Sequence, residues 1–162
     1  MISGLFSLLG AAVLVVIDQL IKHWATAALL PVGNMDVLPG IVELRYCLND
    51  GMAFSMLAGK QTLLIGMTSV MLVVVAVMLF TRKMSVWERI SWTLILGGGV
   101  GNLIDRALLG FVTDMFETTF VHFAIFNVAD IGVVVGGILL CLHVIFAFGK
   151  GWKEEKEEEE NP

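Results

Sequence analysis

An uncharged apolar run, TLLIGMTSVMLVVVAVMLF, occupies residues 62–80. An α-helix of about 20 apolar residues is long enough to cross the hydrocarbon core of a bilayer, so this run predicts a membrane-spanning helix. Three further stretches, residues 5–30, 86–104 and 124–148, come close to the same length and apolarity. We therefore expect a mainly α integral membrane protein with four transmembrane helices.

The overall composition agrees with that prediction. Of the 162 residues, 57% are hydrophobic and 15% are charged, and the mean hydropathy is +0.88. These values exclude a water-soluble domain. Residues 1–149 should form a single membrane-embedded domain, whereas residues 150–162 are acidic and predict a disordered cytoplasmic tail. The chain has no basic surface pattern typical of nucleic-acid binding, so we expect no nucleic-acid partner.

The orientation in the membrane follows from the basic residues. Arg82, Lys83 and Arg89 lie in or beside the connection between the second and third predicted helices, and short basic loops are typically cytoplasmic. Both termini should then be cytoplasmic, with residues 31–60 and 106–123 outside. We expect the first apolar stretch to be a helix and not a cleaved signal peptide, because no Lys or Arg precedes it and it is longer than a signal core.

The first outer loop has a different pattern. Residues 42–49 alternate between apolar and polar side chains, which predicts a β-strand, and residues 49–51 form a turn signal. A small extracytoplasmic β-sheet formed by the loop after the first helix is therefore expected. With the apolar residues at 52–56 nearby, this sheet could be a simple connector or could cradle a lipidic substrate.

Several Asp and Asn residues nevertheless stand in or beside apolar runs. They are Asp18, Asn102, Asp105, Asp114, Asn127 and Asp130. An ionisable group in a bilayer costs free energy, so its presence there indicates a functional site. Asn102 and Arg106 share one face of the third predicted helix, and Asn127 and Asp130 share one face of the fourth. If the outer connection folds back, Asp114 can meet Asp130.

Paired carboxylates have a known chemistry. Asp114 and Asp130, if held close, would share one proton, so that one acts as a base toward water and the other as an acid toward a carbonyl. Such a pair hydrolyses peptide bonds without a metal or a covalent intermediate. Two alternatives to a catalytic role are an ion pair of Asp105 with Arg106 or Arg45 and a helix cap. For Asp105 the ion pair is as well supported as a catalytic role. Because the His and Cys residues lack metal-ligand spacing, we expect no metal.

Glycines are concentrated on the third and fourth predicted helices. They are Gly97, Gly98, Gly99 and Gly101 on the third, and Gly132, Gly136 and Gly137 on the fourth. Small residues at four-residue spacing are typical of close helix packing in lipid. That prediction is favoured over a phosphate-binding loop.

Five short motifs, taken in order, resemble those of the lipoprotein signal peptidases, also called signal peptidase II, which are bacterial membrane aspartic proteases. They are Asp18-Gln19 with Lys22, NDGMAF at residues 49–54, GGGVGNLIDR at 97–106, GFVTD at 110–114 and FNVAD at 126–130. The resemblance extends to about residue 148. Val100 and Met115 depart from the family pattern, but neither change involves a polar group.

The resemblance implies that Asp114 and Asp130 are the catalytic pair. It implies supporting roles in a polar pocket for Asp18, Lys22, Asn49, Gly51, Asn102, Asp105, Arg106 and Asn127. The implied substrates are prolipoproteins that are cleaved just before a diacylglyceryl cysteine, and no cofactor is expected. Membrane lipids and lipopeptide inhibitors of the globomycin type are the other implied partners. The implied location is the bacterial cytoplasmic (inner) membrane, with the active site near the outer face.

Two other classes of function remain open from the residues. A small proton-coupled transporter subunit could use Asp18, Asp105 and Asp130 as a relay, although the predicted acids lie toward one side of the membrane. A non-enzymatic assembly factor could use the polar residues only to join helices. Asp to Asn replacement separates these hypotheses, because it keeps much of the hydrogen bonding but removes the proton chemistry.

Overall fold

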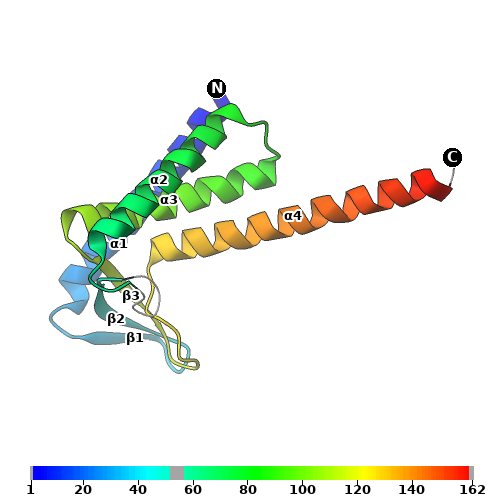
Figure 1. Ribbon diagram of the computed structural model, residues 1–162. Helices are drawn as coiled ribbons and strands as arrows, with labels where there is room; N and C mark the ends of the chain where they lie inside the picture. The colour runs from blue at the N-terminus through cyan, green and yellow to red at the C-terminus, as the bar shows by residue number, and fades with distance from the viewer. Residues whose placement is uncertain (1, 52–56, 161–162) are drawn as a thin grey trace.

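The computed structural model describes residues 2–51 and 57–160 of the chain. Within these ranges it contains four helices and a three-stranded sheet, which confirms the predicted mainly α class (Figure 1). The elements are α1 (Ile2–Leu29), β1 (Asn34–Leu38), β2 (Val42–Asn49), α2 (Gln61–Thr81), α3 (Val86–Leu108), β3 (Val112–Thr118) and α4 (Val128–Glu160).

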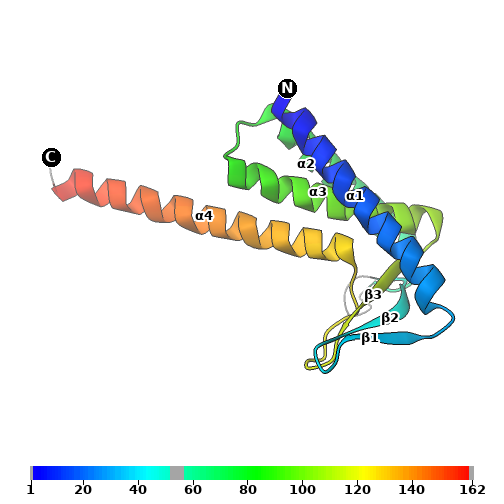
Figure 2. The ribbon, with the colours of Figure 1, turned by 180° about the vertical axis from the view of Figure 1, so that it is seen from behind.

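Three of the described helices are long and apolar enough to cross a membrane: α1, α2 and, over residues 128–147, α4. The helix α3 is less apolar because its last two turns carry Asn102, Asp105 and Arg106. It also contacts each of the other three helices, so much of its surface faces protein. Its polar side chains are therefore not required to face lipid. This central position is visible from both sides of the molecule (Figures 1 and 2).

Several helix boundaries differ from the prediction, and those of α3 and α4 bear on the site. The helix α3 continues to Leu108, and α4 begins at Val128 instead of residue 124. The residues before α4 are extended because the Phe126 backbone N–H donates to the Phe116 carbonyl at 3.1 Å, which ties this segment to β3. At its other end α4 extends to Glu160, through part of the acidic segment predicted to be disordered; Glu and Lys are good helix formers.

Glycines allow the backbones of α3 and α4 to approach closely, as predicted. A Cβ at Gly98 would collide with the Ala129 carbonyl oxygen and would lie 2.8 Å from Val133 Cγ2. A Cβ at Gly136 would lie 2.7 Å from the Ser91 carbonyl oxygen. These contacts hold the first three turns of α4 against the first half and the middle of α3.

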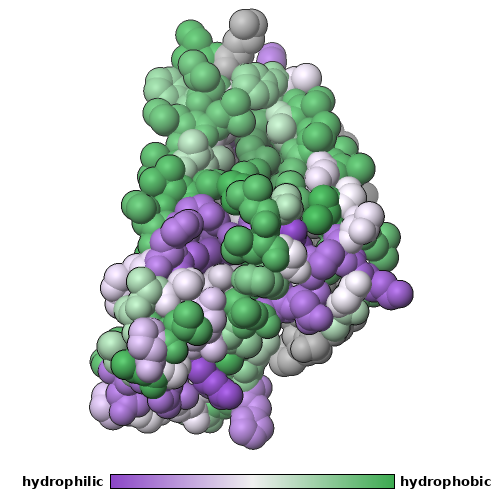
Figure 3. Space-filling view, turned by 90° about the vertical axis from the view of Figure 1, so that its left-hand side faces the viewer, coloured by the Kyte–Doolittle hydropathy of each residue, from purple (hydrophilic) through white to green (hydrophobic). Residues whose placement is uncertain are grey.

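The sheet has the strand order β1-β2-β3 and is antiparallel throughout. The predicted strand at residues 42–49 is β2. The third strand, β3, comes from the second outer connection and was not predicted; it places Asp114 directly opposite Cys47. The sheet lies beyond the ends of α1 and α3 (Figure 1), and polar residues gather at this end while apolar residues cover the helices (Figure 3).

The sheet packs against the end of α1 through a small apolar cluster. Ala25 and Leu29 at the end of α1 pack with Leu44 of β2 and Met115 of β3. Met115 is fully buried in this cluster. Because neighbouring side chains on a strand point to opposite faces, burying Met115 turns the adjacent Asp114 toward α3 and α4.

Candidate active site

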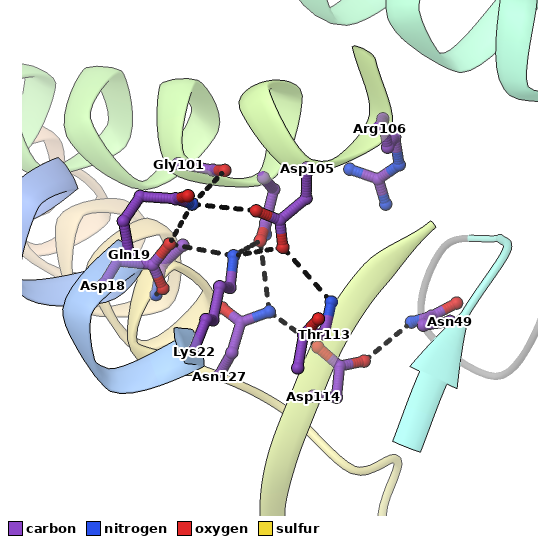
Figure 4. Close-up of polar contacts among 12 residues, drawn as sticks. Asp18, Gln19, Lys22, Asn49, Gly101, Asp105, Arg106, Thr113, Asp114 and Asn127 are labelled. Atoms are coloured by element: carbon purple, nitrogen blue, oxygen red, sulfur yellow. Dashed lines mark hydrogen bonds and ion pairs between the residues drawn. The ribbon is translucent and has the colours of Figure 1, made fainter. Parts of the chain in front are cut away.

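The ten residues that the sequence singles out lie in one continuous hydrogen-bonded network. The network joins the second half of α1, the end of α3, the start of α4 and the ends of β2 and β3, and most of it is drawn in Figure 4. These segments are far apart in the sequence, so the site depends on the whole fold.

The carboxylates of Asp114 and Asp130 each accept two N–H groups. Asp114 Oδ1 accepts from Asn127 Nδ2 at 2.6 Å, and Oδ2 accepts from Asn49 Nδ2 at 3.0 Å. Asp130 Oδ1 accepts from Asn102 Nδ2 at 2.7 Å, and Oδ2 accepts from the Asn127 backbone N–H at 3.2 Å. Both carboxylates are therefore held in defined orientations.

Asn127 also caps α4. Its side-chain oxygen accepts from the Asp130 backbone N–H at 2.9 Å, while the Asp130 carboxylate accepts from the Asn127 backbone N–H. This reciprocal arrangement is that of a capping box. It places Asp130 in the first turn of α4, where the helix dipole favours negative charge. The helix-cap alternative therefore holds for Asp130. The same residue also lines the cavity described below.

A buried ion cluster lies beneath the two carboxylates. Lys22 Nζ is 2.8 Å from Asp18 Oδ2, 3.1 Å from Asp105 Oδ2 and 2.9 Å from Asn102 Oδ1. Lys22 and Asp105 are each 3% exposed and Asp18 is fully buried. All three Lys22 donors are satisfied, as a buried ammonium requires. The Asn102 oxygen also accepts from Asn127 at 3.1 Å, which orients its amide toward Asp130.

The ion pair expected for Asp105 has a different partner from those proposed. Asp105 pairs with Lys22 and not with Arg106 or Arg45, because α1 packs against α3 on the face that carries Asp105. Arg45 instead pairs with Glu117 across the sheet at 3.2 Å. A second Asp105 contact, from the Thr113 backbone N–H at 3.2 Å, links the cluster to β3.

Sequence reasoning missed the role of Gln19. Its side-chain amide donates to Asp105 Oδ1 at 2.8 Å and to the Gly101 carbonyl at 3.2 Å. The available signal was its position directly after Asp18 in an apolar run. Asp18 itself accepts from the Ala129 backbone N–H at 2.9 Å, so α1 holds both α3 and the start of α4.

Arg106 connects α3 to the turn after β2. Its Nη2 donates to the Gly51 carbonyl at 2.8 Å, and the Gly51 N–H donates to Asn49 Oδ1 at 2.9 Å. The latter contact is an Asx turn, which confirms the predicted turn. The chain continues into residues 52–56, whose apolar side chains could by sequence form part of a cradle for a lipidic substrate, and these residues lie outside the described ranges.

A cavity of about 350 Å³ opens over the two carboxylates. Asn49, Asn102, Arg106, Asp114 and Asp130 line its polar end. Its remaining wall is apolar and comes from Val112 of β3, the segment 123–126, and Ile131 and residues 133–135 of α4. An apolar cavity with a few convergent polar groups is the usual form of a small-molecule or peptide site.

The electrostatics of Asp114 suit proton sharing. Burial and the nearby charge of Asp130 raise the pKa of Asp114 from 3.8 to about 6, against the lowering effects of Asn49, Asn127 and Lys22. A carboxyl group with this pKa can hold a proton close to neutral pH. Paired aspartates that act as acid and base need this property.

Helices that are long and apolar enough to cross a membrane indicate a multi-pass membrane protein, and two carboxylates at the polar end of a cavity suit a membrane enzyme. A family model described as signal peptidase (SPase) II matches residues 10–146, and the chain belongs to the signal peptidase II family of membrane peptidases. The lipoprotein signal peptidase of Lactococcus lactis subsp. lactis (strain IL1403) is 39% identical over 141 residues, covering 87% of this chain and 94% of that protein. The corresponding protein of Streptococcus pyogenes serotype M6 is 38% identical over 148 residues, covering 91% and 93%.

Solved structures agree with this membership. A bacterial membrane enzyme structure determined by the in meso method at 2.3 Å resolution superposes with a TM-score of 0.83 at 28% identity, covering 90% of each chain. A second such structure, at 1.9 Å resolution, gives a TM-score of 0.77 at 29% identity and covers 86% of this chain and 92% of the other. The family resemblance expected from the five motifs is therefore confirmed.

Proposed function

We propose that this protein is an aspartic endopeptidase that removes signal peptides from diacylglyceryl-modified prolipoproteins, cleaving just before the lipidated cysteine. The observation that carries the proposal is the placement of Asp114 and Asp130, from different elements, at the polar end of one cavity. The curated relatives named lipoprotein signal peptidase support the substrate class.

The proposed mechanism uses a proton shared by the two aspartates. The ionised carboxylate takes a proton from a water molecule, which attacks the scissile carbonyl, while the protonated partner donates to the carbonyl oxygen. The proton taken from water then passes to the leaving amine as the C–N bond breaks. At the same time the ionised partner recovers a proton from a hydroxyl of the tetrahedral intermediate, so that the pair again carries one proton. Because the two groups titrate jointly, the pair carries one proton and neither residue is assigned it.

The other network residues would position this pair. Asn102 and Asn127 orient the carboxylates, and Lys22 holds Asn102 from below. The Arg106 guanidinium lines the cavity beside them and would anchor the substrate backbone or the turn at Gly51. Asp18 and Asp105 would compensate the charge of Lys22 and hold the helices together.

The cavity also suits the substrate's lipid. Its apolar wall runs along α4 from the carboxylates, so acyl chains attached to the cysteine could lie there while the scissile bond stays at the polar end. We propose that this end faces the outer side of the bacterial cytoplasmic membrane, with both termini cytoplasmic. Lipopeptides of the globomycin type would compete for the same cavity.

The test is cleavage of a diacylglyceryl prolipoprotein by purified protein in detergent, with a chelator present throughout. Asp114→Asn and Asp130→Asn should each reduce cleavage by about 10²- to 10⁴-fold, the usual contribution of acid–base catalysis. Asp36→Asn, at an exposed position of β1, is the matched control and should retain activity. Unchanged cleavage in either dyad variant would refute the assignment, and an inactive wild-type protein would favour the transporter or assembly hypotheses.

A further inference from the structure

A second cavity, of about 300 Å³, lies on the sheet side of the two residues Asn49 and Asp114. The residues found in this cavity and not in the first are Cys47, Leu48, Asp50 and His122. Asn49, Asp114 and the segment 123–125 line both cavities. The two cavities therefore meet at Asp114, one of the two proposed catalytic carboxylates.

Strand geometry explains why these residues share a surface. Cys47 and Asn49 are two apart on β2, so their side chains point to the same face of the sheet. Cys47 lies directly opposite Asp114 of β3 in the antiparallel pairing, and opposed residues of such a pair also share a face. The side chains of Cys47, Asn49 and Asp114 therefore lie next to one another on one face of the sheet.

The chemical character of the two cavities differs. The first extends along the apolar side chains of α4. The second is bounded by the exposed, polar residues Asp50 and His122 and lies on the sheet, where polar side chains gather (Figure 3). A prolipoprotein changes in the same way along its length, since the signal peptide and the acyl chains on the cysteine are apolar, whereas the segment that follows the cysteine enters water.

We propose that the second cavity binds the first residues of the mature lipoprotein, those that follow the lipidated cysteine, and guides them away from Asp114 along the sheet. This inference rests on the proposed function and assigns Cys47, Asp50 and His122 as substrate-positioning residues. The cavity's volume of about 300 Å³ is that of a small-molecule site, so the cavity can hold a few extended residues but not a folded domain.

The chain offers a direct chemical probe of this cavity. Its two cysteines are both free thiols: Cys47 is half-buried in the second cavity, and Cys141 is exposed on α4 and lines neither cavity. In the Cys141→Ser variant a benzyl methanethiosulfonate can modify only Cys47. The Cys47→Phe variant places similar bulk at the same position without a labelling step.

The experiment compares two substrates that share a signal peptide and a diacylglyceryl cysteine. One continues for several residues of the mature protein, and the other ends as an amide at the lipidated cysteine. Bulk at Cys47, introduced by either route, should lower kcat/KM for the long substrate by about tenfold or more, within the range by which a pocket discriminates ligands, and should leave the short substrate nearly unaffected. A reductant should restore cleavage by the labelled protein.

Labelling Cys141 in the Cys47→Ser variant is the control and should not change the ratio of the two rates. Equal loss for both substrates would overturn the inference, because bulk at Cys47 would then be disturbing Asp114 itself. Unchanged cleavage of both substrates by Cys47→Phe would also overturn it, since the mature segment would leave by another route. If the unmodified protein cleaved neither substrate, the proposed function would fail first.

Discussion

The side-chain amide of Asn127 donates to Asp114 Oδ1 at 2.6 Å. The same side chain caps α4 through its oxygen, and the backbone N–H of Asn127 donates to Asp130. One residue thus holds both aspartates, one from the sheet and one from a helix. Catalytic geometry and the start of α4 are therefore coupled at Asn127.

Replacing Asn127 by Ser should separate these two roles. Ser is an equally good N-cap, so the start of α4 should be kept, but Ser lacks an amide to donate to Asp114 and Asn102. We expect cleavage to fall by about tenfold or more, the equivalent of one charge-assisted hydrogen bond of about 1.5–3 kcal/mol. Asn127→Ala should lose activity and also about 1 kcal/mol of stability. Full activity of Asn127→Ser would show that Asp114 does not need this contact.

Lys22→Met should destabilise the fold. The substitution leaves Asp18 and Asp105 buried without a cation, and breaking a buried ion pair in this way costs about 3–5 kcal/mol. The Tm in detergent should fall clearly, whereas Lys83→Met at an exposed position should leave it unchanged. Adding Asp105→Asn to Lys22→Met should recover part of the loss. Equal Tm values for Lys22→Met and Lys83→Met would contradict the ion cluster.

Gly98→Ala should separate α3 from α4. The new methyl group would collide with the Ala129 carbonyl oxygen, a backbone atom that cannot rotate away, and would shift the turn that carries Asp130. We expect lower Tm and lower activity together. Gly137→Ala is the matched control, because nothing lies within 4 Å of its Cβ position, and it should be neutral or stabilising by about 0.5–1 kcal/mol. Similar behaviour of the two variants would contradict the packing.

Asn49→Ala should change the pH dependence of cleavage. Asn49 donates to the Asp114 carboxylate and so lowers its pKa, which burial and Asp130 raise to about 6. Without that donor the pKa rises further, and the shared proton is retained to higher pH. The alkaline limb of the kcat/KM profile, which reports ionisations of the free enzyme, should therefore move upward. Asn34→Ala on the exposed strand β1 is the control; an unmoved or lowered limb for Asn49→Ala would count against a catalytic proton on this pair.

Local patterns were enough to predict the helices and the strand β2. An uncharged apolar run such as residues 62–80 forms a helix in a bilayer because its backbone must be satisfied internally. The cost of burying Asp and Asn in such runs marked six residues of the network before any geometry was available: Asp18, Asn102, Asp105, Asp114, Asn127 and Asp130. The alternation in residues 42–49 predicted β2 for an equally local reason.

The tertiary structure alone decided which of these residues meet. Lys22 and Asn102 are 80 positions apart in the sequence, and no periodicity encodes that contact or the choice of Lys22 over Arg106 as the partner of Asp105. The strand β3 likewise forms by pairing with β2. The helix α4 begins only at Val128 because Phe126 pairs with Phe116 of β3. Side-chain periodicity reports only which face of an element is buried; the partner across that face is chosen by packing of the complete chain.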